Sequence, residues 1–175
     1  MNPIPLMAAA TAISISITAF ASGTHSHQQG AATGEPGRAA DADRTVTIEM
    51  YDNYYEPESI DVKAGETVRF IVKNKGDLVH EFRIATADMH DAHQEEMEMM
   101  VEHGVIKGDH IDHEMMKMDM GNGQTMEHSD PNSVLMEPGE TRELVWAFTE
   151  AADLEYACNV PGHYQAGMYG DIEFE

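Results

Sequence analysis

The sequence has 175 residues, a length that suits one domain with tails better than two domains. Its formal net charge of −22 argues against nucleic acid and anionic membranes as partners, because both attract basic patches. The acidity favours cations and basic proteins instead. The single cysteine allows no internal disulfide, so the fold must depend on its apolar core and on any metal ion that it binds.

Residues 1–21 have the pattern of a secretory signal peptide. A mostly apolar core from Leu6 to Phe20 is followed by the small-x-small cleavage site Ala19-Phe20-Ala21. The core is shorter than the roughly 20 residues that a membrane span needs. We therefore expect export to the periplasm by the general secretory route, with no stable membrane insertion after cleavage. An uncleaved membrane anchor is the alternative, since no Lys or Arg precedes the core.

Residues 22–43 are rich in Gly, Ala, Ser and Thr and contain the pair His25 and His27. This composition predicts a disordered, histidine-containing leader. A folded domain is expected over residues 44–175, where the hydrophobic pattern changes.

Alternation of apolar and polar residues predicts half-buried strands throughout residues 44–175. Eight are expected: a strand from Arg44 carrying Val46, Ile48 and Met50, a short one with Ile60 and Val62, and further strands at 67–73, 80–84, 134–137, 141–148, 154–158 and 169–174. Short strands separated by Gly and Pro turns are typical of an all-β fold with two packed antiparallel sheets.

Three metal-binding side chains recur at equal spacing near the end of the chain, in the pattern Cys158-x4-His163-x4-Met168. Gly162 and Gly167 allow the intervening chain to turn, so that all three side chains reach one point. His80, at the start of an expected strand, offers a second imidazole. Two His, one Cys and a weak axial Met form the arrangement of copper electron-transfer sites. Taken singly, each residue has an ordinary alternative, such as an unpaired thiol or a core methionine.

These motifs resemble those of the cupredoxins, the single-domain type 1 copper proteins. The similarity covers about residues 45–175 apart from one insertion, and it is carried by Tyr156-x-Cys158-x-x-Pro161-Gly162-His163 and by the run from Tyr55 through Phe70 to Asn74 and His80. The resemblance implies a Greek-key β-sandwich in which one type 1 copper ion is bound by His80, Cys158, His163 and axial Met168. Plastocyanins carry Asn directly after the first histidine, whereas this chain has Glu81.

An acidic insertion at residues 85–130 holds six histidines and nine of the 14 methionines. Asp88 and Gly104 are expected to bound a helix over 89–103, and a second helix is expected over 109–118. Thioethers suit Cu(I), and imidazole accepts both oxidation states of copper. The insertion therefore predicts additional copper sites, with these candidate ligands: His90, His93, Met97, Met100, His110, His113, Met116 and Met118. Alternatively, the methionines form the apolar face of a helix packed on the sandwich.

Together these features are similar to the periplasmic copper-tolerance cupredoxins of the CopI type. Our first hypothesis is a protein that binds surplus copper and oxidises Cu(I) to Cu(II). The second is a soluble electron carrier of the plastocyanin or rusticyanin kind, in which the acidic insertion docks a basic redox partner. A copper chaperone that delivers metal to an oxidase is a third hypothesis.

Overall fold

The computed structural model describes residues 33–117 and 130–175. The signal segment 1–21, the leader histidines His25 and His27, and the candidate ligand Met118 lie outside the described residues. Across the described ranges, no helix is long and apolar enough to cross a membrane.

Strands dominate the described chain. Their bounds are β1 Glu35–Pro36, β2 Arg44–Tyr51, β3 Tyr54–Glu56, β4 Ser59–Val62, β5 Glu66–Asn74, β6 His80–Ala85, β7 Ile106–Lys107, β8 His110–Ile111, β9 Ser133–Met136, β10 Thr141–Phe148, β11 Leu154–Ala157 and β12 Tyr169–Phe174. The helices are α2 at Ala87–Glu102 and two 3-10 turns, η1 at Ala39–Asp41 and η2 at Met115–Lys117. All eight predicted strands are present, and the structure adds β1, β3 and the pair β7 and β8.

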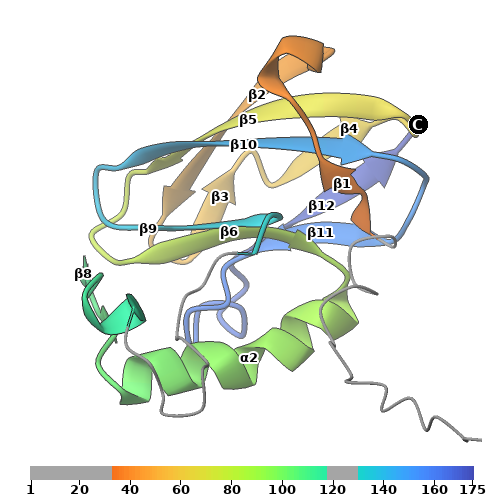
Figure 1. The fold of residues 1–175 in the computed structure, drawn as a ribbon. Helices are drawn as coiled ribbons and strands as arrows, with labels where there is room; N and C mark the ends of the chain where they lie inside the picture. Colours follow the sequence, from red (N-terminus) through yellow and green to blue (C-terminus); the bar gives the residue numbers. More distant parts are fainter. Residues whose placement is uncertain (1–32, 118–129) are drawn as a thin grey trace, which may run out of the picture.

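Ten of these strands form two sheets, in the orders β1-β10-β5-β2-β3 and β4-β12-β11-β6-β9. Figure 1 shows the two sheets as stacked layers. The predicted β-sandwich is confirmed, although two of its strand pairs, β2 with β5 and β12 with β4, are parallel. The chain passes from β3 in one sheet to β4 in the other before it returns as β5. For this reason β5 runs in the same direction as β2.

The core lies between the sheets and follows from the period of two. In β5, Val68, Phe70 and Val72 are fully buried, while the residues between them are partly exposed. Strand β6 differs, because all six of its residues are buried. One face of β6 points into the core, and helix α2 lies over the other, below the sandwich in Figure 1. Strand β6 begins at His80, so the candidate site is buried between the core and the segment that includes α2.

The insertion is partly helical, as predicted. Thr86, rather than Asp88, caps α2 by accepting a hydrogen bond from the amide of Met89. The helix predicted for 109–118 is wrong. There Ile106 pairs with Ile111 across a β7–β8 hairpin whose turn contains Gly108 at φ 54°, and only a 3-10 turn follows. The β-branched side chains near this turn are buried, which favours a hairpin over a helix; they are Val105, Ile106 and Ile111.

The described end of the leader differs from the disordered segment that we predicted. Glu35 and Pro36 pair with Ala147 and Trp146 of β10, so β1 extends the first sheet. The indole Nε1 of Trp146 also donates a hydrogen bond of 2.6 Å to the carbonyl of Thr33. The partner of β1 is more than 100 residues away in sequence, so the local composition of residues 22–43 could not predict this pairing.

Candidate metal centre

His80 is the first residue of β6, and a tight loop connects it to the end of β5. The buried Asn74 organises this loop: its Nδ2 donates to the carbonyls of Leu78 and Met136, and its Oδ1 accepts from the amide of Gly76. The imidazole of His80 is fully buried. The loop therefore fixes both the position and the direction of this side chain.

Asp52, from the turn between β2 and β3, orients the imidazole of His80. Its Oδ1 lies 2.9 Å from His80 Nε2, and the carboxylate also accepts from the amides of Asp77 and Leu78. Although partial burial raises the pKa of Asp52, these hydrogen bonds lower it overall. An ionised acceptor holds the proton of His80 on Nε2, which leaves the Nδ1 lone pair for a metal ion. Asp52 was not predicted from the sequence, since its partner lies 28 residues away.

The second part of the site is the loop between β11 and β12, from Cys158 to Met168. Its backbone closes on itself, because the amide of Cys158 donates to the carbonyl of Met168, and the amide of Met168 donates to the carbonyl of His163. Gly162 and Gly167 adopt φ values of 90° and 95°, which other residues rarely adopt. The predicted turns are therefore present, and they bring the ends of the Cys158–Met168 segment together.

Three ligand atoms converge where the two loops meet. The Nδ1 atoms of His80 and His163 lie 3.2 Å apart, and Sγ of Cys158 lies 3.8 Å from the first and 3.4 Å from the second. A triangle with these sides has a centre about 2 Å from each atom, close to the usual length of about 2.0–2.3 Å for bonds from imidazole or thiolate to a transition metal. Among the described residues, this is the one such group of His, Cys, Asp or Glu side chains within 4.8 Å of one another. The donor set thus fits a trigonal metal ion.

Burial controls the protonation of all three side chains. It lowers the pKa of His163 to about 4, with a further decrease from the neighbouring His80. It also lowers the pKa of His80, although Asp52 opposes this effect. Burial raises the pKa of the Cys158 thiol to about 12. At neutral pH the two imidazoles are therefore neutral, and each has one nitrogen free to bind, whereas a metal ion must displace the thiol proton.

Met168 is fully buried at the end of the same loop. Its backbone is hydrogen-bonded to those of both Cys158 and His163, so the residue lies next to two of the three ligand-bearing residues. An axial thioether at this position remains a prediction.

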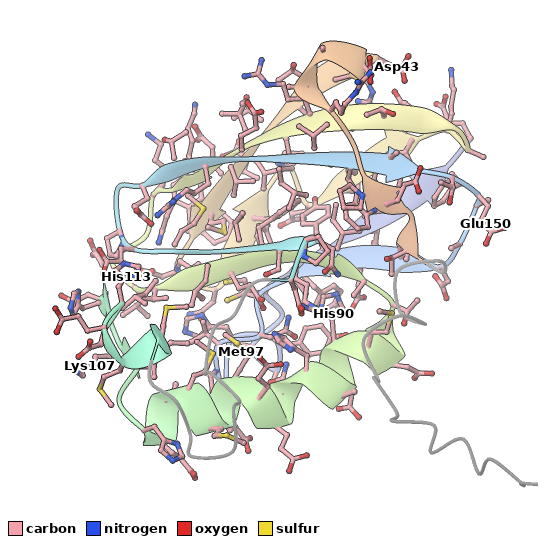
Figure 2. The ribbon with its side chains drawn as sticks, in the orientation of Figure 1. Asp43, His90, Met97, Lys107, His113 and Glu150 are labelled. Carbon is pink, nitrogen blue, oxygen red and sulfur yellow. The ribbon has the colours of Figure 1, made fainter. Side chains whose placement is uncertain are left out.

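The candidate ligands of the insertion fall into two groups. His90, His93, Met97 and Met100 are buried along the inner face of α2, and Figure 2 shows His90 and Met97 pointing from the helix toward the sandwich. By contrast, His110 and His113 are exposed and Met116 is half-buried. His110 forms an ion pair of 2.7 Å with Glu137. The structure thus brings the first four into the interior and leaves His110, His113 and Met116 near the surface.

A buried polar pair links the two loops of the site. Glu81 follows His80, Asn159 follows Cys158, and both side chains are fully buried. Asn159 Nδ2 donates to Glu81 Oε2 at 2.7 Å, and the amide of Glu81 donates to Cys158 Sγ at 3.3 Å. Glu81 differs from the residue that plastocyanins carry and was noted in the sequence for this reason, whereas Asn159 was not predicted. Its position directly after the cysteine was the available signal.

Known proteins similar to this chain share both its sequence and its fold. The sequence profile of the Cupredoxin-like domain matches residues 11–110. The copper-resistant cuproprotein CopI of Pseudomonas aeruginosa is 47% identical over 169 residues, which cover 93% of each chain. The protein of the same name from Rubrivivax gelatinosus is 37% identical over 151 residues, covering 86% of this chain and 78% of that relative.

Solved structures of low sequence identity share the fold. Auracyanin B superposes with a TM-score of 0.57 at 16% identity, covering 81% of this chain and 96% of that structure. Dithionite-reduced auracyanin from Roseiflexus castenholzii gives 0.54 at 18% identity, covering 77% and 98%. Together with the profile match and the 47% identical relative, the sandwich shows that this chain belongs to the cupredoxin family.

Proposed function

We propose that this chain binds one copper ion through His80, Cys158 and His163, with Met168 as a weak axial ligand, and that it acts in copper tolerance. The convergence of the three ligand atoms within 4.8 Å carries the proposal. Two imidazoles, a thiolate and a weak thioether suit both Cu(I) and Cu(II), so the bound ion is able to cycle between them. The relatives named copper-resistant cuproprotein CopI support the role in tolerance.

The protein's own residues account for a rigid site. His80 is oriented by Asp52, and the loop from Cys158 to Met168 is closed by its own backbone hydrogen bonds. The ligands are therefore held in place before the metal binds. Ligands held in this way would offer Cu(I) and Cu(II) nearly the same positions, which would favour rapid electron exchange.

Export to the periplasm belongs to the same proposal and rests on the signal pattern of residues 1–21. There the chain would oxidise Cu(I) by passing one electron to a redox partner protein. The formal charge of −22 favours a partner with a basic surface, because charge complementarity raises the rate of association.

Additional copper ions in the insertion complete the proposal. His110 and His113 are exposed, so an incoming ion reaches them without any rearrangement of the core. The half-buried Met116 and, from the sequence, Met118 add soft ligands that suit Cu(I).

The number of copper ions held tightly per purified mature chain tests this proposal against the electron carrier. We expect more than one in the wild type. About one should remain when His110 and His113 are replaced by Gln, and Met116 and Met118 by Leu. The matched control replaces the exposed Met99 by Leu and His103 by Gln, which should leave the number unchanged. A single ion in the wild type would favour the electron carrier and overturn the role of the insertion.

We expect Asp52→Asn to weaken copper binding about 10- to 100-fold, the usual effect of losing a partner of a metal-bound histidine. The neutral amide no longer favours the His80 tautomer with a free Nδ1. Asp43→Asn is a suitable control, because Asp43 likewise accepts a backbone hydrogen bond, from Thr67, and belongs to neither loop of the site. Competition with a copper chelator measures both affinities. Equal affinities in the two variants would show that Asp52 does not act on His80.

A further inference from the structure

The insertion contacts the candidate site directly. Helix α2 lies below the β11–β12 loop in Figure 1. Side chains of the helix contact this loop at several points. The ring of His90 stacks on that of Tyr164, the residue after His163, with centroids 5.7 Å apart. Gln165 Nε2 donates to Gln94 Oε1 at 3.3 Å. These contacts connect the insertion to the loop that carries three of the four proposed ligands.

Asn159 is the first of two buried contact points between α2 and the site. Gln94 Nε2 donates to Asn159 Oδ1 at 2.8 Å. His90 Nδ1 lies 3.1 Å from Asn159 Nδ2. The same Nδ1 lies 3.2 Å from Asn159 Oδ1. Because burial lowers the pKa of His90 to about 4, its imidazole is neutral, and Nδ1 either accepts from the Asn159 amide group or donates to its oxygen, according to the tautomer. The side chain of Asn159 is thus held from the α2 side by two residues.

Glu81 is the second contact point. Its Oε1 accepts a hydrogen bond of 2.6 Å from Ser133 and lies 3.4 Å from Nε2 of His93. Its Oε2 accepts from both the amide and the side chain of Asn159. A buried carboxylate is costly unless such groups surround it. His93 therefore helps to hold Glu81 in place, and through it the amide that donates to Cys158 Sγ.

We propose that His90 and His93 are positioning residues of the metal centre, which hold Asn159 and Glu81 and thereby the two loops that carry the ligands. The proposal deepens the proposed function and rests on it. It assigns these two histidines a different role from that of ligands for additional copper. It also means that the insertion is not a detachable module, so a deletion of residues 85–130 would disturb the site itself.

Pairs of substitutions distinguish the two roles. His93→Gln keeps a side-chain N–H near Glu81, and His90→Asn keeps both a donor and an acceptor near Asn159. His90→Leu and His93→Leu remove these groups. His103→Leu is the control, because His103 is exposed at the end of α2. Circular dichroism and thermal unfolding of each variant verify that it is folded.

The first readout needs no copper. In the metal-free protein we expect His93→Leu and His90→Leu to speed hydrogen exchange of the backbone N–H of Asn159 about tenfold. This N–H donates to Glu81, and each variant removes a contact that holds Glu81 or Asn159 in place. The Gln and Asn variants should restore most of the protection, and His103→Leu should have no effect. Unchanged exchange in both Leu variants would overturn the proposal.

The second readout uses the copper-loaded protein. We expect both Leu variants to shift the visible absorption and the reduction potential while the number of bound copper ions stays the same. Loss of one copper ion with an unchanged spectrum would instead make the histidines ligands and overturn the proposal. A wild type without strong visible absorption would refute the proposed type 1 site, and the exchange measurements on the metal-free protein would still decide the role of the histidines.

Discussion

Replacing Cys158 by alanine is expected to abolish the intense visible absorption of the Cu(II)-loaded protein and to lower its copper affinity by more than about 100-fold. Substitutions outside the ligand set of a metal already cost about 10- to 100-fold, and this one removes a ligand. The chain has no other cysteine to replace the thiolate. Without it, two imidazoles and a thioether remain, which bind less tightly and give no thiolate-to-copper absorption.

Val160→Ala is the matched control for this variant. Val160 is buried in the same loop and also loses atoms, but its side chain offers no ligand. We expect Val160→Ala to keep the visible absorption and to lose about 1 kcal/mol of stability, as is usual for a small truncation. Titration with copper followed by absorption spectroscopy measures both variants. If Cys158→Ala kept the band of the wild type, the proposed site would be wrong.

Gly170→Ala is expected to lower the free energy of unfolding by about 3 kcal/mol, at the upper end of the cost of overpacking a core. Gly170 of β12 lies opposite Tyr156 of β11. A methyl group at Gly170 would lie 2.3 Å from Cζ of Tyr156, closer than real contacts allow. The ring has little freedom to move, because it is fully buried, packs on Tyr55 and donates to the carbonyl of Pro57.

A double-mutant cycle isolates this clash. Tyr156→Leu removes the ring atoms nearest to Gly170, so in this background Gly170→Ala should cost less than about 1 kcal/mol. Residues in contact show such non-additive effects, whereas independent ones do not. Urea denaturation of the four metal-free proteins gives the comparison. An equal cost in both backgrounds would mean that the strain arises elsewhere than at Tyr156.

Much of the sandwich followed from local sequence. The alternation along Thr141–Phe148 and Tyr169–Phe174 predicted β10 and β12 with their observed bounds, because a strand with one buried face shows that face at every second residue. Very short strands could not be predicted in this way. Two residues of β8 are too few to show a period, and the spacing of His110 and His113 suited a helix equally well.

The candidate site likewise has parts that the sequence predicted and parts that it did not. The spacing of Cys158, His163 and Met168 lies within one loop, so glycines at the right places sufficed to predict that these residues meet. His80 was predicted only as a histidine before a strand, and the partner of its Nε2 was not predicted at all. Asp52 is supplied by a different turn, and no local pattern identifies which of 32 acidic residues lies there.

The sequence by itself determined the fold class and the candidate copper ligands of this protein, because strand period, turn glycines and ligand spacing are local properties of the chain. Only the tertiary structure decided what surrounds those ligands. Glu81 and Asn159 are 78 residues apart in sequence and meet because β6 and β11 are neighbours in one sheet. His90 and His93 face inward because α2 packs over that sheet, and burial then makes them partners of Asn159 and Glu81.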